Sequence, residues 1–398
     1  MFKSLFAVPI LALALLPGCA GAQSGNFCPL KVQTEFRSIE LDAVRSGGPP
    51  PNGIPPLGFA DDSQKLPDTN PAQFETVEQA AGWLTPREPV ILVTAGNETG
   101  IFPLQVLIWH EIANATLGGV PLAVTFCPLC NTALVADRRV PIGTEQRPRL
   151  KGTLSAEKSV LVTFGVSGLL YNSDLVMFDS ATHSLWYQAT LRGVVGPLTG
   201  TQLRIYPSAI VPFAEAAKDA PQARVLSKNT GYERQYGRNP YVGYDDANAP
   251  PFLYDGPLDG RLPPKERVVT VSIGTAKAAY PFSVLAELGA VNDTVGQTPV
   301  AVLWAAGTNS ALDAGEISEG QDIGAGVVFD RRLDGQTLTF ASENGVIRDR
   351  ETNSTWTLTG QAVSGQLKGQ RLKPVAHVNP FWFAWAAYAP ETRIYAPR

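Results

Sequence analysis

The chain has 398 residues, of which 44% are hydrophobic and 17% are charged. This length suits two or three domains, and the apolar content excludes a largely disordered protein. Lys and Arg number 32 against 36 Asp and Glu, which gives a net charge of −4. The charge argues against nucleic-acid binding, because a nucleic-acid binder needs a basic surface.

The N-terminus has the pattern of an export signal. Lys3 precedes an apolar run at residues 5–16, which has the length of a secretory signal and is too short to span a bilayer. The sequence LPGC at 16–19 resembles a bacterial lipobox with Cys19 as the lipidated residue, whereas AGA at 20–22 offers ordinary signal-peptidase cleavage. Residues 1–22 therefore predict export, either to a lipid-anchored state at the outer membrane or in the periplasm, or to a soluble periplasmic state. The only membrane contact expected is through the N-terminal lipid.

An internal repeat organises the rest of the chain. Residues 101–134 align without a gap onto residues 279–312 at a shift of 178, and twelve of the 34 positions are identical. The period is too long for a solenoid, so we expect one duplication that gives two lobes. The predicted organisation is an extended Pro/Gly-rich segment at 23–82, a first lobe at 83–227, a connector with five tyrosines at 228–267, and a second lobe at 268–398.

Each lobe is predicted to contain a short helix, several strands and a second helix. Pro103 and Pro281 begin the first helix of each lobe, which we expect to end at Gly118 or Gly296. Buried strands are expected at 121–126, 161–165, 299–304 and 327–329, and second helices at 212–219 and 381–388. The predicted fold class is α+β, strand-dominated, with two similar lobes.

The repeat also separates candidate structural positions from candidate reactive ones. Four reactive side chains of the first copy are replaced in the second: His110 by Leu288, Glu111 by Gly289, Cys127 by Ala305 and Cys130 by Thr308. Their joint loss is expected if they form one site in the first lobe.

The Cys-x-x-Cys spacing of Cys127 and Cys130 at the end of a strand is typical of a metal knuckle, in which one turn points two thiolates at one ion. His110 is the expected third ligand, and Glu111 or Cys28 the fourth. Thiolates with an imidazole suit zinc or copper. If the metal kept an open position the site could be catalytic; otherwise it would be structural or carry the metal.

Two other interpretations of the same cysteines remain open. A thiol–disulfide oxidoreductase would use Cys127 as the nucleophile and Cys130 as the resolving thiol, although a strand and turn lack the helix N-terminus that lowers a thiol pKa. Alternatively, a structural 127–130 disulfide would belong to a non-catalytic envelope protein that binds a small molecule or another envelope protein. His183 is expected to be an exposed turn residue.

Several motifs in order resemble a bacterial family that is catalogued as a domain of unknown function, number 3179. These motifs are GGPPPNGIP at 47–55, FP and HE at 102–111, CPLCN at 127–131, FGVSG at 164–168, SLW at 184–186 and FWFAW at 381–385. The resemblance covers nearly the whole chain after the signal and implies no activity. The family pattern favours Asp at the positions of Asn52 and Ala115, so a role for either carboxylate would be impaired here.

Overall fold

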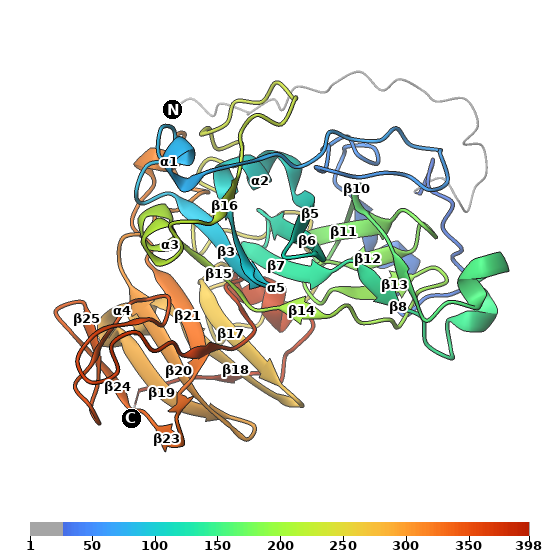
Figure 1. Ribbon diagram of the computed structural model, residues 1–398. Coiled ribbons are helices and arrows are strands. Elements are labelled where there is room, and N and C mark those ends of the chain that lie inside the picture. Colours follow the sequence, from blue (N-terminus) through green and yellow to red (C-terminus); the bar gives the residue numbers. More distant parts are fainter. Residues whose placement is uncertain (1–26, 398) are drawn as a thin grey trace, which may run out of the picture.

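The computed structural model describes residues 27–397, and the expected signal and lipobox with Cys19 lie outside the described residues. Antiparallel sheets make up most of the regular structure, and the helices are few and short (Figure 1). The fold is therefore α+β and strand-dominated, as predicted. In the described part, no helix is long and apolar enough to cross a membrane.

Three sheets form the first half of the molecule. The first contains, in spatial order, β1 (Val44–Ser46), β10 (Phe164–Tyr171), β11 (Asp174–Asp179), β12 (Leu185–Tyr187) and β13 (Arg192–Val195). The second contains β14 (Ile205–Tyr206), β7 (Thr132–Asp137), β6 (Val120–Cys127) and β5 (Ile112–Leu117). The third contains β15 (Ser208–Pro212), β3 (Pro89–Ala95), β4 (Glu98–Pro103), β16 (Arg224–Leu226) and β2 (Phe74–Glu75). The short pair β8 (Arg139–Pro141) and β9 (Ser159–Leu161) lies apart from these sheets.

The second half has a similar set of sheets (gold, orange and red in Figure 1). One contains β29 (His377–Val378), β17 (Val268–Ile273), β18 (Ala276–Pro281) and β30 (Arg393–Ile394). Another contains β19 (Ala290–Val295), β20 (Thr298–Ala305), β21 (Ala325–Asp330) and β28 (Lys373–Pro374). The last contains β24 (Phe340–Glu343), β25 (Val346–Asp349), β26 (Thr355–Trp356) and β27 (Ala362–Ser364), and β22 (Arg332–Leu333) pairs with β23 (Gln336–Thr337).

The helices are α1 (Val77–Ala80), α2 (Leu104–His110), α3 (Phe213–Asp219), α4 (Phe282–Leu288) and α5 (Trp382–Ala386), with 3-10 turns at Leu41–Ala43, Arg147–Arg149, Gly152–Ser155 and Ile317–Glu319. The predicted end of the first helix was wrong: α2 stops at His110, and residues 112–117 form strand β5. The reason is the next residue, Glu111, whose left-handed φ of 57° reverses the chain into the strand. Gly289, at φ 63°, does the same after α4.

The two halves share strand register at the spacing of the sequence repeat. Val90 pairs with Pro103 in the first half, and Val268 pairs with Pro281 in the second, 178 residues later. The β5–β6 and β19–β20 hairpins match in the same way, through Ile112 with Thr125 and Ala290 with Leu303. This is a correspondence of pairing, and a duplication as its origin stays a prediction.

Each half also ties two of its sheets together with one asparagine side chain. The amide of Asn114 donates to the Phe164 carbonyl at 2.9 Å and accepts from the Phe164 N–H at 2.8 Å. Asn292 makes the same pair with Phe340 at 2.7 and 2.8 Å. A side-chain amide has the same donor and acceptor groups as a peptide unit. It can therefore hydrogen-bond to the backbone of a strand in the neighbouring sheet, as a further strand would.

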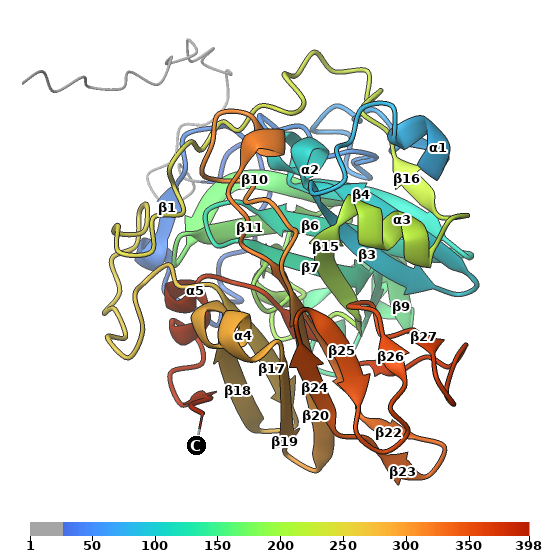
Figure 2. The ribbon, with the colours of Figure 1, turned by 90° about the vertical axis from the view of Figure 1, so that its left-hand side faces the viewer.

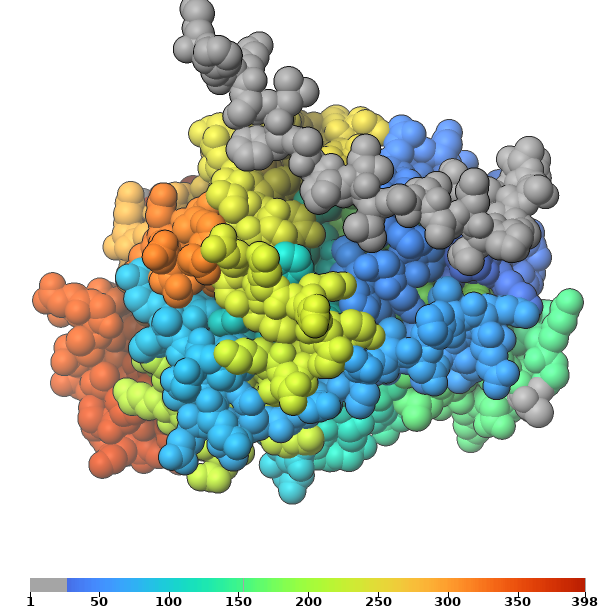
Figure 3. Space-filling view, turned by 90° about the horizontal axis from the view of Figure 1, so that it is seen from above, coloured from blue at the N-terminus to red at the C-terminus, as the bar shows by residue number. Residues whose placement is uncertain are grey.

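The halves are not independent in their cores. The largest hydrophobic cluster joins the β3–β7 region to Leu312, Phe381 and Phe383 of the second half. Figure 2 shows α5 beside the second-half strands and below the first-half sheets. The connector at 228–267 has no regular secondary structure and lies over the first half, next to the N-terminal segment (yellow and blue in Figure 3).

Candidate metal centre

The turn between β6 and β7 holds both cysteines on the same side of the sheet. Cys127 ends β6 opposite Thr132, and the Cys130 N–H donates to the Cys127 carbonyl at 3.3 Å. Asn131 closes the turn at φ 52°, a left-handed conformation that asparagine tolerates well. Both cysteines are buried, and both thiols are free. The turn therefore has the knuckle geometry expected from the sequence.

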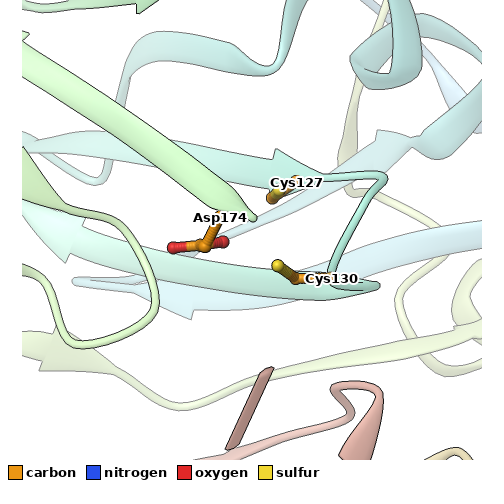
Figure 4. Close-up of side chains that lie close together, drawn as sticks. All are labelled: Cys127, Cys130 and Asp174. Atoms are coloured by element: carbon orange, nitrogen blue, oxygen red, sulfur yellow. The ribbon is translucent and has the colours of Figure 1, made fainter. Parts of the chain in front are cut away.

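The β10–β11 hairpin brings a carboxylate to these two sulfurs. Its two-residue turn has positive φ at Asn172 (52°) and Ser173 (64°), which is the type I′ geometry of tight hairpins. Asp174 is the first residue after the turn. Its ligand atom and the sulfurs of Cys127 and Cys130 all lie within 4.8 Å of one another (Figure 4). We call these three side chains the cysteine–aspartate cluster.

One oxygen of Asp174 is unused within the described protein. Oδ2 accepts from the Ala189 N–H at 2.7 Å, whereas Oδ1 is buried and has no hydrogen-bond partner. The hydroxyls of Ser173 and Tyr187 are also buried without a partner. Buried polar atoms are normally paired, because an unpaired one loses its bonds to water without replacement. The thiols of Cys127 and Cys130 are the groups that face the Asp174 carboxyl, and their hydrogen bonding lowers its pKa against the effect of burial.

Glu111 adds a second buried carboxyl beside the cluster. Burial, and next the carboxyl of Asp174, raise the pKa of Glu111 to about 8. Burial likewise raises the pKa of Asp174 to about 7 and the pKa of both thiols above their usual range. In residues 27–397, no Lys, Arg or His side chain hydrogen-bonds or ion-pairs with any of the four groups. Four acids thus share a space with no protein cation.

Glu111 is held in a strained conformation. A residue with a Cβ at φ 57° costs about 1–2 kcal/mol relative to a right-handed one. The second half uses Gly289 at the matching position, where no such cost arises. The first half therefore keeps a glutamate at a position where the second half has the glycine that the backbone favours.

A roof of aromatic side chains covers the cluster. Tyr241 and Tyr244 come from the connector, and Tyr187 and Tyr388 come from β12 and the segment after α5. Burial raises the phenol pKa of all four, and acids of this site, Glu111 or the members of the cluster, raise it further. The five connector tyrosines of the sequence are therefore ordered and pack against the first-half core.

His110 is not part of the cluster, contrary to the expectation that it supplies the third ligand. Its Nδ1 lies 2.7 Å from the Pro55 carbonyl, so it carries the proton and donates. Its Nε2 then accepts from the Tyr236 hydroxyl at 2.6 Å. Burial lowers the pKa of His110 to about 4, so the ring is neutral. Both ring nitrogens are occupied in fixing the N-terminal segment and the connector to α2.

Two other sequence expectations need correction. Cys28 is disulfide-bonded, so it offers no thiolate to a metal. His183 is buried, not exposed: its Nδ1 accepts from the Lys31 N–H at 2.9 Å, and its Nε2 lies 3.2 Å from Ser63 Oγ and 3.3 Å from Asp61 Oδ1. Because Ser63 and Asp61 share one ring nitrogen, this group is not a catalytic relay and instead fixes the N-terminal segment.

Asp174 was missed because it lies on an extension that only the first half has. The hairpin from Phe164 to Asp179 spans 16 residues, whereas the matching hairpin from Phe340 to Asp349 spans 10. The repeat comparison found only aligned positions, so it could not find a residue without a counterpart. The signal that could have shown it is Asn172-Ser173, a turn pair that places the next residue at a hairpin tip.

A family model described as "Protein of unknown function (DUF3179)" matches residues 63–392, which is most of the chain. The motif at 47–55 lies before the matched range. No curated protein and no solved structure matches the chain.

Proposed function

The chain belongs to the DUF3179 family of proteins of unknown function, and we propose from the geometry of its first half that it binds a transition-metal ion. The ligands are the two sulfurs of Cys127 and Cys130 and the carboxylate of Asp174. The observation that carries the proposal is that a carboxylate oxygen and two free thiols, all buried, lie within 4.8 Å of one another. A divalent cation would stabilise these groups in their ionised forms.

The donor set favours zinc. Zinc takes thiolate and carboxylate ligands in a tetrahedron, whereas Cu(I) prefers sulfur alone. Three protein ligands converge here, and the carboxylate of Glu111 is not among the ligand atoms that lie within 4.8 Å of one another. Glu111 is a buried neighbour that raises the pKa of Cys127, and its side chain would have to move to complete a tetrahedral shell.

The electrostatics are consistent with a bound cation. Burial raises the pKa of all four acids, and the carboxyl of Asp174 raises the pKa of Glu111 and of both thiols further, so the empty site favours protonated groups. A bound divalent ion reverses this preference, because it stabilises thiolate and carboxylate directly. Metal binding would therefore release protons and become tighter as the pH rises.

The thiol–disulfide alternative fits the same residues less well. A nucleophilic cysteine needs an accessible thiol with a lowered pKa. Cys127 and Cys130 are both buried, and burial raises the pKa of each thiol. The adjacent carboxyls of Asp174 and Glu111 disfavour a thiolate further.

We also propose that the protein is exported. The support is the sequence alone: Lys3 and the apolar run at 5–16 have the pattern of an export signal. Mass spectrometry of the N-terminus of the protein isolated from its native cells tests this proposal. Removal of the signal is expected, and an intact N-terminus at Met1 would contradict it.

Elemental analysis of the purified protein with thiol counting tests the metal site. We expect about one zinc per chain, lost in Cys127→Ser, Cys130→Ser and Asp174→Asn, with affinity lower by about 10–100-fold or more for each lost ligand. The matched control is Asp137→Asn, which removes a buried carboxylate of β7 that is paired with Arg139 outside the cluster. It should keep its zinc. A metal-free protein that takes up no zinc when titrated, and whose two thiols form a stable 127–130 disulfide, would overturn the proposal.

A further inference from the structure

A small cavity lies where the two halves and the end of the connector meet. Its volume is about 20 Å³. A water molecule needs a cavity of about 10–15 Å³, so this one has room for one water and little more. Residues of both halves line it, among them Leu104 and Asn131 of the first half, Asn309 and Asn379 of the second, and Arg267 at the end of the connector. We call it the junction cavity.

Three of these side chains have a buried polar atom without a hydrogen-bond partner in residues 27–397. The atoms are Nε of Arg267, Oδ1 of Asn309 and Oδ1 of Asn379. Asn309 is 2% exposed and Asn379 is 5% exposed, so neither amide can turn to bulk water. Buried polar atoms are normally paired, because an unpaired one has lost its bonds to water without replacement. A polar occupant of the junction cavity would provide a partner for all three.

The other hydrogen bonds of the two asparagines fix which atom is left over. The amide nitrogen of Asn309 donates to the Ile317 and Ser318 carbonyls at 3.3 and 2.8 Å. The amide nitrogen of Asn379 donates to the Gly326 carbonyl at 3.0 Å. Turning either amide over would place its oxygen against a carbonyl oxygen, so the orientation is determined by its neighbours. Both asparagines therefore offer the cavity an acceptor.

Arg267 offers the donor. Its Nη2 already donates to Asp245 Oδ2 at 2.6 Å and to Ser310 Oγ at 2.9 Å, which leaves the Nε–H unused. Ser310 directly follows Asn309 in the sequence, so the same contact holds Arg267 beside the segment that carries Asn309. The junction cavity thus combines one donor with two acceptors, supplied by three segments that are distant in the sequence.

This combination favours a small neutral molecule over an ion. A metal cation would be repelled by the guanidinium of Arg267, and an anion would face the two amide oxygens. Water can donate two hydrogen bonds and accept others, and a buried water makes about three hydrogen bonds in all. We propose that the junction cavity binds one water molecule, which donates to Oδ1 of Asn309 and Oδ1 of Asn379 and accepts from the Nε–H of Arg267.

The bound water has a consequence for the cysteine turn. The carbonyl of Asn379 accepts from the Asn131 side chain at 2.7 Å, and Asn131 closes the turn after Cys130. Phe381, two residues further, donates its N–H to the Cys130 carbonyl at 2.9 Å. A water that fixes the side chain of Asn379 therefore also fixes the segment to which the turn is bonded. Asn379 becomes a positioning residue for the turn, and only this consequence rests on the proposed metal site.

A crystal structure of the wild-type protein that shows ordered water tests the site directly. We expect one water at hydrogen-bond distance, about 2.7–3.2 Å, from all three atoms. An ion in the junction cavity would overturn the proposal. So would a cavity without ordered water, or side chains of Asn309 and Asn379 that rotate to bond to other protein groups.

The number of long-lived buried waters in solution, measured by magnetic relaxation dispersion, tests the same site by mutation. Asn379→Leu removes one acceptor and should lose one such water. Ala311→Val keeps all three polar atoms but adds volume at the wall of the cavity, so it should also lose one. The matched control is Asn114→Leu, which removes a buried asparagine whose amide bonds to Phe164 outside the cavity. The control should keep the wild-type number, and an unchanged number in both cavity variants would overturn the proposal.

Zinc titration separates the positioning role from the metal site itself. Asn379→Leu should still bind about one zinc per chain, with affinity lower by about tenfold, because it loosens the support of the cysteine turn. An unchanged affinity in a variant that has lost its water would overturn the positioning role. A wild-type protein that binds no zinc would instead contradict the proposed function, and the water count would still decide whether the junction cavity is occupied.

Discussion

The two halves of the chain surround equivalent points with the same elements and use them differently. In the first half, the end of β6, the residue after α2 and the tip of the β10–β11 hairpin fill the point with two thiols and two carboxyls. In the second half, the same positions line an open cavity of about 380 Å³ between Gly289, Trp304, Ala305 and the tip of the shorter β24–β25 hairpin. The strands and the helix that the two halves share therefore do not by themselves make the proposed site. What distinguishes the first half is its four acidic side chains, its longer β10–β11 hairpin and the tyrosines that cover them.

The largest expected difference between the two halves is in the pH dependence of stability, to which only the acids of the first half contribute. Asp174 and Glu111 have pKa values near 7 and 8 in the folded protein, above the ordinary values near 4. The folded state therefore holds more protons than the unfolded one, and the stability that these groups contribute is present below about pH 4 and is lost as the pH rises through 7 and 8. The slope is about 1.4 kcal/mol per pH unit for each proton.

Urea unfolding of the metal-free protein from pH 5 to pH 9 measures that slope. Asp174→Asn and Glu111→Gln should each flatten it, and Asp137→Asn should not. Saturating zinc should raise the melting temperature more at pH 8 than at pH 6. An unchanged slope in both carboxyl variants, Asp174→Asn and Glu111→Gln, would show that the two carboxyls are already ionised in the folded state.

The next largest effect on the free energy of unfolding is expected at Asn114 and Asn292, the asparagines that join two sheets in each half. Asn114→Ala removes the two bonds to Phe164 and a third to the Leu57 carbonyl from a buried position, so it should cost about 2–4 kcal/mol. Asn292→Ala removes two bonds at a half-buried position and should cost about 1–2 kcal/mol. Equilibrium denaturation of both variants checks the order. A larger cost at Asn292 would contradict the idea that the first half is the more tightly fixed.

Substitutions at the residue that follows α2 or α4 should change the free energy of unfolding by about 1–3 kcal/mol, in opposite directions in the two halves. Glu111→Gly removes the left-handed strain and a buried acid, so the metal-free protein should gain stability by about 1–2 kcal/mol while zinc binding weakens. Gly289→Ala places a Cβ 2.4 Å from the Ser342 Cβ and should lose stability by about 1–3 kcal/mol. A metal-free protein destabilised by Glu111→Gly would mean that the carboxyl makes a contact essential to the fold.

The smallest effect is expected at the open cavity. Ala306 is exposed at its edge, so Ala306→Val should alter the free energy of unfolding by less than about 0.5 kcal/mol. Ala301→Val, five residues earlier in the buried part of β20, should cost about 1–3 kcal/mol. Thermal unfolding of the pair measures how freely the second half tolerates change at the point where the first half holds its cluster.

The sequence predicted the scaffold better than the site. The repeat located the strands β6 and β20 and the helices α2 and α4, because apolar residues recur there at fixed spacing. It also identified Cys127 and Cys130 as neighbours, since a four-residue turn leaves little choice. The end of α2 was missed because nothing in the sequence announces a left-handed glutamate.

The wrong expectation for His110 and the missed Asp174 have a common cause. Contacts between residues that are distant in the sequence determine which side chains reach the cysteines. His110 is adjacent to Glu111 in sequence, but Pro55 and Tyr236 occupy its ring nitrogens. Asp174 joins the cysteines because of the length of a hairpin some 40 residues later. Neither fact follows from residue types or spacing near the cysteines.

The cysteine turn is completed by the last part of the chain to be synthesised. The Asn131 side chain donates to the Asn379 carbonyl at 2.7 Å, and the Cys130 carbonyl accepts from the Phe381 N–H at 2.9 Å. On a ribosome, residues 127–131 emerge long before residues 379–381, so the turn gains these two hydrogen bonds only when almost the whole chain has been made. A chain truncated before Asn379 would lack both of them.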